Sequence, residues 1–229
     1  MNRHRATHLP SERKLWILSI LSALFISALV VCNLIASKFI TLDLGVTTFE
    51  ISAGVLPYPI TFLITDLLSE FYGKRITQRV VLSGFVALIF TMGVLYMGGA
   101  FPALDNSPVS DAAYTQVFGN SPRVIMASMV AYLLAQLVDV RLYHFWKRLT
   151  NGRMLWLRNN FSTVLSQLVD TTLVVGILFI GDASWTFIGG LIIHGWLFKV
   201  IAAALDTPLM YAGVAVFRKI GIEPAPADA

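Results

Sequence analysis

The chain has 229 residues, of which 56% are hydrophobic and 13% are charged, whereas soluble domains average about 45–50% apolar and about 25% charged residues. Together with a mean hydropathy of +0.73, this composition excludes both a soluble globular protein and a disordered one. Because one crossing of a bilayer core takes about 20 apolar residues, six crossings use about 120 positions and leave only short loops. The composition therefore predicts a compact, all-α polytopic membrane protein.

Six apolar segments follow one another along the chain and predict six transmembrane helices. They cover residues 14–40, 54–72, 79–98, 123–146, 159–181 and 191–217. Pro57 and Pro59 lie inside the second segment, where we expect the helix to be kinked or broken. A polar loop separates the third segment from the fourth. The apolar region 183–217 is too long for one upright helix, so we expect residues 185–190 to form an interfacial lead-in.

The positive charges are distributed unequally between the two ends of these segments. Fourteen of the 17 Lys and Arg residues fall near the two termini, in the loop after the second segment, or around the loop after the fourth. The positive-inside rule therefore places both termini in the cytoplasm. We expect residues 1–13 and 218–229 to be cytoplasmic tails around a transmembrane domain at 14–217. The net charge of +4 is explained by this topology and by anionic lipid, so we expect no nucleic-acid partner.

Ionisable residues inside the predicted spans are the most informative feature of the sequence. Each costs roughly 2.5–3.5 kcal/mol at a helix centre unless it is paired or lies near an end. Five are acids and one is a base, which leaves a surplus of four negative charges; they are Asp66, Glu70, Asp139, Asp170, Lys199 and Asp206. Some of the acids are therefore expected to be protonated, interfacial or in a water-filled cavity.

Several of these residues have structural alternatives. Glu70 lies one turn from a loop, so it is expected either to snorkel or to belong to a site. Asp139 lies two residues before Arg141, which makes an interfacial salt bridge an alternative. We expect the central Lys199 to pair with a membrane acid, Asp170 or Asp206 being the best candidates.

The spacing of polar residues adds a second pattern. The tetrapeptide Gln-Leu-Val-Asp occurs at 136–139 and again at 167–170, and each copy places an amide and a carboxylate on one helix face. Such pairs suit a planar solute that forms hydrogen bonds. Ala127, Ala131 and Ala135 recur at four-residue spacing, which is typical of close helix packing.

Several kinds of chemistry lack their sequence signals. The single cysteine, Cys32, excludes an intrachain disulfide, and no zinc-binding spacing is present. We expect no metal and no cofactor. The chain contains neither a phosphate-binding G-x-x-x-x-G-K-[ST] loop nor an H-E-x-x-H or G-x-S-x-G motif. An intramembrane enzyme that uses paired aspartates, Asp139 and Asp170, stays open as an alternative.

The polar stretches resemble one known family. They are TDLLSEFYGKR at 65–75, AQLVD at 135–139, LWLRNN at 155–160, Ser162 and Thr163, SQLVDT at 166–171, Lys199, DTP at 206–208 and Tyr211. In combination they resemble the queuosine precursor transporter group of the vitamin uptake transporter family, over roughly residues 24–217.

This resemblance implies six membrane helices in the bacterial inner membrane. It also implies import of a 7-deazaguanine, such as 7-cyano- or 7-aminomethyl-7-deazaguanine, for queuosine modification of tRNA. The residues expected to form the substrate site are Asn33, Asp66, Glu70, Gln136, Asp139, Asn160, Gln167, Asp170, Lys199 and Asp206. We expect direct contacts from five of them, Gln136, Asp139, Asn160, Gln167 and Asp170. An aromatic side chain such as Tyr72 or Trp196 is expected to stack on the flat ring.

The leading hypothesis is a solitary secondary transporter, with membrane lipid and a small molecule as its partners. The alternatives are a substrate-binding subunit that needs a separate ATPase, the intramembrane enzyme, and a purely structural assembly subunit. A homodimer is plausible for six short helices. For energy coupling we expect protons, with Asp170 as the first candidate carboxylate and Asp66 as the second, unless Lys199 holds Asp170 ionised.

Overall fold

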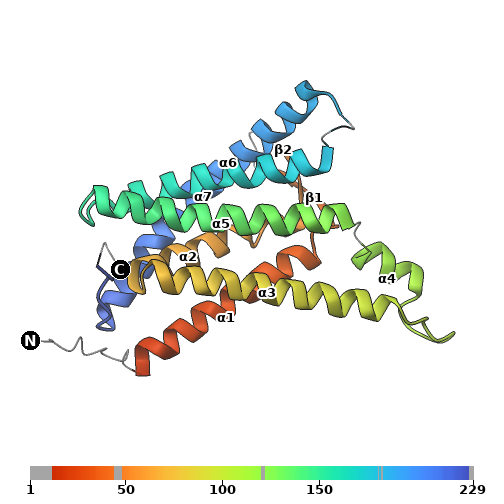
Figure 1. Cartoon of the computed structure of the whole chain (residues 1–229), viewed down its shortest axis with the longest axis horizontal. Helices are drawn as coiled ribbons and strands as arrows, with labels where there is room; N and C mark the ends of the chain where they lie inside the picture. Colours follow the sequence, from red (N-terminus) through yellow and green to blue (C-terminus); the bar gives the residue numbers. More distant parts are fainter. Residues whose placement is uncertain (1–11, 44–47, 120–121, 180, 182, 227–229) are drawn as a thin grey trace, which may run out of the picture.

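The computed structural model describes residues 12–43, 48–119, 122–179, 181 and 183–226. The residues it describes form seven α-helices, one 3-10 turn (η1) and one β-hairpin (Figure 1). In chain order the elements are α1 (Glu12–Leu34), β1 (Phe39–Asp43), β2 (Thr48–Ser52), η1 (Ala53–Val55), α2 (Tyr58–Phe71), α3 (Lys74–Gly99), α4 (Asp111–Phe118), α5 (Pro122–Leu149), α6 (Leu155–Phe179) and α7 (Trp185–Lys219).

The first predicted helix is wrong at its C-terminal end. The sequence analysis extends it to residue 40, but α1 stops at Leu34, and Phe39 and Ile40 belong to β1. β1 pairs antiparallel with β2, in a register that places Phe39 opposite Ser52. Hydropathy does not distinguish a helix from a strand here, whereas the aromatic and β-branched residues of 39–41 favour a strand.

The second predicted helix starts later than expected, because its prolines lie at its start. η1 covers Ala53–Val55, Pro57 caps α2, and Pro59 lies in its first turn. Proline is tolerated there, since the first-turn N–H groups have no intrahelical partner. The predicted interruption therefore separates η1 from α2 and does not bend one continuous helix. α2 has 14 residues, ten of them buried, and is the central helix of the fold.

The last predicted helix is longer than expected. Residues 185–190 are not a separate lead-in: α7 runs without a break over 35 residues and contains Pro208. The Ser184 hydroxyl caps it by accepting a hydrogen bond from the Phe187 amide at 3.3 Å. At 1.5 Å per residue, α7 is about 52 Å long, which exceeds the roughly 30 Å of a bilayer core and requires tilt or projection. The short α4 in the loop after α3 was not predicted.

Large apolar side chains of the helices are exposed and several polar side chains are buried, as is typical of a membrane protein. Among the described residues, α1, α3, α6 and α7 are long and apolar enough to cross a bilayer. α3 exposes large apolar side chains, Val86 at 65% and Phe90 at 71%, whereas Asp66, Gln136 and Asp139 are buried. The remaining two predicted spans correspond to α2, which has only 14 residues, and to the 28-residue α5. The chain is thus an all-α, multi-pass membrane protein.

The beginning of α1 and the end of α7 lie at the same end of the molecule, opposite the hairpin and α4 (Figure 1). A hydrogen bond of 3.3 Å from the Arg13 guanidinium to the Ile220 carbonyl joins the two segments. The first and last described helices thus meet at one face; of the predicted tails, residues 1–11 and 227–229 lie outside the described part of the chain. We call this face the terminal end and the opposite one the hairpin end.

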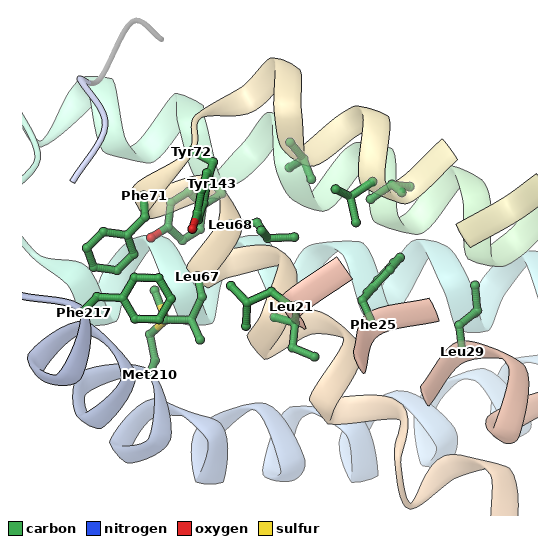
Figure 2. Packing of buried hydrophobic residues seen from close by; sticks show 14 of the residues in the cluster. Leu21, Phe25, Leu29, Leu67, Leu68, Phe71, Tyr72, Tyr143, Met210 and Phe217 are labelled. Carbon is green, nitrogen blue, oxygen red and sulfur yellow. The ribbon is translucent and has the colours of Figure 1, made fainter. Parts of the chain in front are cut away.

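The apolar core surrounds α2. Phe71 stacks on Phe217 of α7 with ring centroids 4.4 Å apart, and Leu67 and Met210 pack beside them (Figure 2). Ala127, Ala131 and Ala135 of α5 are fully buried, so their predicted packing role is confirmed. This core holds α2 against α1, α5 and α7, and thereby positions the polar side chains that α2 carries.

Candidate substrate site

A cavity of about 350 Å³ lies near the hairpin end, a size within the usual range for small-molecule sites. Its wall comes from the end of α1, η1 and parts of four other helices. The lining residues are Leu29, Cys32, Asn33, Ala36, Ser52, Gly54, Val55, Tyr58, Ser128, Tyr132, Asp170, Val174, Leu178 and Lys199. Gly54 is required here, because a Cβ at this position would lie 2.3 Å from the Cys32 carbonyl oxygen.

Three polar side chains meet at one side of this cavity. Lys199 of α7 forms an ion pair of 2.5 Å with Asp170 of α6, so the predicted pairing of Lys199 with a membrane acid is confirmed. The Tyr58 hydroxyl of α2 donates to the other Asp170 oxygen at 2.9 Å. Lys199 also lies 5.1 Å from the centroid of the Tyr58 ring. This triad connects three helices, and the sequence analysis did not identify Tyr58 as one of its members.

A second, much smaller space of about 20 Å³ adjoins the triad. Val55, Tyr58 and Lys199 line both spaces, and Gln167 and Asp206 line only the smaller one. About one water fits in such a volume. Tyr58 and Lys199 of the triad therefore border both the large cavity and a narrow, mostly apolar space between α2, α6 and α7.

Two predicted asparagines hold helices together at the margins of the site. Asn33 accepts a hydrogen bond of 3.0 Å from Ser128 of α5 and lines the large cavity. Asn160 donates to the Thr207 hydroxyl of α7 at 2.7 Å. Asn33 is thus placed to reach a ligand in the cavity, whereas Asn160 connects α6 to α7 beside Pro208.

Four buried side chains between α2, α5 and α6 carry oxygens without a hydrogen-bond partner. These acceptor oxygens are Asp66 Oδ1, Gln136 Oε1, Asp139 Oδ2 and Gln167 Oε1, and each side chain is at most 3% exposed. We call them the acceptor cluster. A buried acceptor without a partner costs about 1–3 kcal/mol. All four atoms lack a donor, so the site as it stands is suited to a ligand that is rich in N–H groups.

The two Gln-Leu-Val-Asp copies come together because α5 and α6 are antiparallel neighbours. Asp139 of the first copy accepts a hydrogen bond of 3.0 Å from Ser166, which precedes the second copy. Asp139 is fully buried, whereas Arg141 is exposed. The alternative of an interfacial salt bridge between these two residues is therefore wrong. Asp139 and Asp170 belong to separate hydrogen-bonded groups.

Glu70 lies in a third polar group at the terminal end. Its carboxylate pairs with Arg158 at 2.8 Å and with Lys147 at 3.1 Å, and it accepts a hydrogen bond of 2.9 Å from the Tyr143 hydroxyl. The Glu70 side chain is only 4% exposed, so the snorkelling alternative is wrong. The Glu70 carbonyl also accepts from the Ala225 amide at 2.7 Å. This inner lock, as we name it, connects α2, α5, α6 and the C-terminal segment.

Sequence reasoning missed the cationic side of the inner lock. Lys147 was counted only as a topology-determining charge, and Arg158 was counted in the same way and within the LWLRNN stretch but given no role in the site, although both are 2% exposed. Their position gave one signal: each lies next to the end of a predicted span, and Glu70 lies near the same end of another predicted span. Of the two aromatic candidates, Tyr72 donates to the Lys14 carbonyl and Trp196 donates to the Val164 carbonyl. Neither lines the two spaces, whose aromatic walls are Tyr58, Tyr132, Phe62 and Phe198.

The ten predicted site residues thus fall into distinct positions. Asn33, Asp170 and Lys199 line the large cavity, and Gln167, Lys199 and Asp206 line the narrow space. Asp66, Gln136 and Asp139 lie buried between the helices. Glu70 is in the inner lock, and Asn160 forms its hydrogen bond to Thr207 of α7. Within the described residues, no three His, Cys, Asp or Glu side chains are arranged to hold a metal ion.

Comparison with known proteins identifies the family. The family model described as "Putative vitamin uptake transporter" matches residues 52–213, which include all of the predicted site residues except Asn33. The "Probable queuosine precursor transporter" of Bacillus subtilis (strain 168) is 32% identical over 160 residues, 69% of this chain and 69% of that protein. The "Queuosine precursor transporter" of Escherichia coli (strain K12) is 28% identical over 142 residues, 59% of this chain and 58% of that protein. No solved structure matches. The chain therefore belongs to the vitamin uptake transporter family, whose members are transporters and not enzymes.

Proposed function

We propose that this protein imports a queuosine precursor, 7-cyano- or 7-aminomethyl-7-deazaguanine, across the bacterial inner membrane. It acts as a solitary secondary transporter with six spans and cytoplasmic termini. The names of its relatives support the substrate class, and the absence of a phosphate-binding loop from the sequence favours transport without ATP hydrolysis by this chain.

The observation that carries the substrate proposal is the acceptor cluster. A 7-deazaguanine offers its ring N1–H, its exocyclic amino group and its pyrrole N–H as donors. Relative to guanine, a carbon replaces N7, so ring position 7 is no longer an acceptor. A ligand of this kind matches side chains that supply unpartnered oxygens. Lys199, a donor in the wall of the cavity, complements the one ring carbonyl of the substrate.

The arrangement supports a route for the substrate. With the hairpin end outside, the substrate enters the large cavity and reaches the triad of Tyr58, Asp170 and Lys199. The acceptor cluster lies beyond this triad, and the inner lock closes the cytoplasmic end. Because buried ion pairs break only at a substantial cost, the lock opens when substrate binding offsets that cost.

The first experiment is uptake of labelled 7-cyano-7-deazaguanine by the purified full chain in liposomes without ATP. Uptake, with weaker competition by guanine, supports the proposal. If purified protein binds the ligand but transports it only with an added ATPase, the solitary mechanism is wrong. If neither 7-deazaguanine binds, the substrate class is wrong.

The placement of the substrate is tested by Gln136→Ala and Gln167→Ala. Each removes an acceptor, and we expect a loss of about 1–3 kcal/mol in binding free energy, while the matched control Gln116→Ala on the exposed α4 leaves affinity unchanged. Unchanged affinity in both cluster variants contradicts this placement. Cys32, the one cysteine of the chain, lines the cavity, so bound substrate is expected to slow its reaction with an externally added thiol reagent.

A further inference from the structure

The wall of the large cavity contains several polar side chains, most of which already use their hydrogens on other protein groups. Four hydroxyl groups donate to protein oxygens: Ser52 to the Ala36 carbonyl, Tyr58 to Asp170, Ser128 to Asn33 and Tyr132 to the Val81 carbonyl. A hydroxyl has only one proton to donate, so these four groups have no donor left for a ligand. The charged residues of the wall, Asp170 and Lys199, are the strongest hydrogen-bonding groups that stay available.

Asp170 and Lys199 keep unused hydrogen-bonding capacity while they are paired. Their ion pair of 2.5 Å takes one of the three N–H groups of the Lys199 ammonium and leaves two. An ionised carboxylate has about four sites that accept hydrogen bonds, and Asp170 fills two of them, with Lys199 and with the Tyr58 hydroxyl at 2.9 Å. The pair thus offers a donor and an acceptor side by side, and no bond of the triad has to break first.

The ion pair is also fixed in position and shielded from water. Tyr58 contacts both partners, because its hydroxyl binds Asp170 and its ring centroid lies 5.1 Å from the Lys199 ammonium. The side chains of Lys199 and Asp170 are only 16% and 6% exposed. Hydrogen bonds to charged groups are roughly twice as strong as those between neutral groups, and a site that excludes water preserves this difference. The pair is therefore suited to select between ligands that differ in a single donor or acceptor.

A guanine-type ring carries the complementary pattern along one edge. Its ring carbonyl is an acceptor, and the neighbouring N1–H and exocyclic amino group are donors. An adenine-type ring has an amino group in place of this carbonyl and an unprotonated nitrogen in place of N1–H. It would therefore place a donor against Lys199, which cannot accept, and an acceptor against the ionised Asp170, which cannot donate.

We propose that the ion pair of Lys199 and Asp170 recognises the carbonyl and amino edge of the 7-deazaguanine ring and determines specificity for guanine-type rings. This inference rests on the proposed function. Lys199 donates to the ring carbonyl, and Asp170 accepts from N1–H and from the amino group, while the pair itself stays intact. These contacts form while the substrate occupies the large cavity, before it reaches the acceptor cluster. Tyr58 is a positioning residue, because it holds both charged groups in place.

The first test measures binding to the purified wild type of three ligands that differ only along this edge. They are 7-cyano-7-deazaguanine, 7-cyano-7-deazahypoxanthine, which lacks the amino group, and 7-cyano-7-deazaadenine, which has the reverse pattern. Loss of one hydrogen bond to a charged group is expected to raise the Kd about 10- to 150-fold for the deazahypoxanthine, and the deazaadenine is expected to bind more weakly still. A Kd for either analogue within about threefold of that for the deazaguanine overturns the inference.

The second test assigns this selectivity to the ion pair. The double variant Asp170→Asn with Lys199→Met removes both charges together, so that no buried charge is left unpaired. The ratio of the Kd for the deazahypoxanthine to the Kd for the deazaguanine is expected to fall by at least about fivefold, because a neutral acceptor replaces a charged one. The matched control combines Asp105→Asn with Lys219→Met, both at exposed positions, and is expected to keep the wild-type ratio.

Gln167→Ala separates the ion pair from the acceptor cluster. This variant is expected to bind both ligands more weakly and to keep their ratio, since Gln167 is not the partner of the amino group. If the ratio falls in Gln167→Ala and is unchanged in the double variant, the acceptor cluster recognises this edge, and the inference is wrong while the proposed function stands. If the wild type binds none of the three ligands, the proposed substrate class is wrong, and this inference fails with it.

Discussion

Replacing Glu70 by glutamine tests the inner lock. Glutamine keeps the size of the side chain and an oxygen that accepts from Tyr143, but it removes the charge shared by Arg158 at 2.8 Å and Lys147 at 3.1 Å. All three ionic side chains are 3–4% exposed, so solvent screening is small. Removing one partner of a buried ion pair costs about 3–5 kcal/mol. We expect a loss in this range, because arginine cannot shed its proton to escape the penalty.

The assay is unfolding of the purified protein in mixed detergent micelles with increasing dodecyl sulfate, followed by tryptophan fluorescence. Glu223→Gln, an exposed position beside the C-terminus, is the matched control and is expected to change stability by less than about 0.5 kcal/mol. In the double variant Glu70→Gln with Lys147→Met, part of the loss is recovered, since one unpaired cation is removed. A loss below about 1 kcal/mol for Glu70→Gln contradicts a buried lock.

Three further substitutions, two of them with a rescue or control variant, test other parts of the structure. Gln167→Ala is expected to leave unfolding stability unchanged or raised, because the oxygen that it removes has no partner without ligand; a clear loss of stability contradicts this. Lys199→Met is expected to abolish uptake and cost about 3–5 kcal/mol by leaving Asp170 buried and unpaired, and adding Asp170→Asn restores stability but not uptake. Gly54→Ala is expected to destabilise by about 1–3 kcal/mol, since its Cβ would lie 2.3 Å from a backbone oxygen. Gly93→Ala, where a Cβ meets nothing within 4 Å, stabilises α3 by about 0.5–1 kcal/mol; equal effects of the two glycine substitutions would contradict the close approach at Gly54.

Hydropathy and spacing were sufficient for much of this protein. The apolar runs located α3, α5 and α6 to within about five residues, because a long apolar run leaves few alternatives to a helix in a membrane. The cost of a buried charge was sufficient to predict that Lys199 pairs with an acid, and the pair with Asp170 confirms it. Composition and the polar stretches pointed to a transporter family, which the family model confirms.

Tertiary structure decided which polar residues share a space. Glu70 is far in sequence from Lys147 and Arg158, and only the packing of α2 against α5 and α6 converts two loop-side cations into buried partners. The same holds for Tyr58, whose hydroxyl reaches Asp170 across 112 positions of sequence. The β-hairpin after α1 also escaped hydropathy, since β-branched apolar residues serve a strand as well as a membrane helix. A single sequence shows which polar groups are costly to bury in a membrane. The partner that offsets this cost is a neighbour in three dimensions, and the packing of the helices determines which residue that partner is.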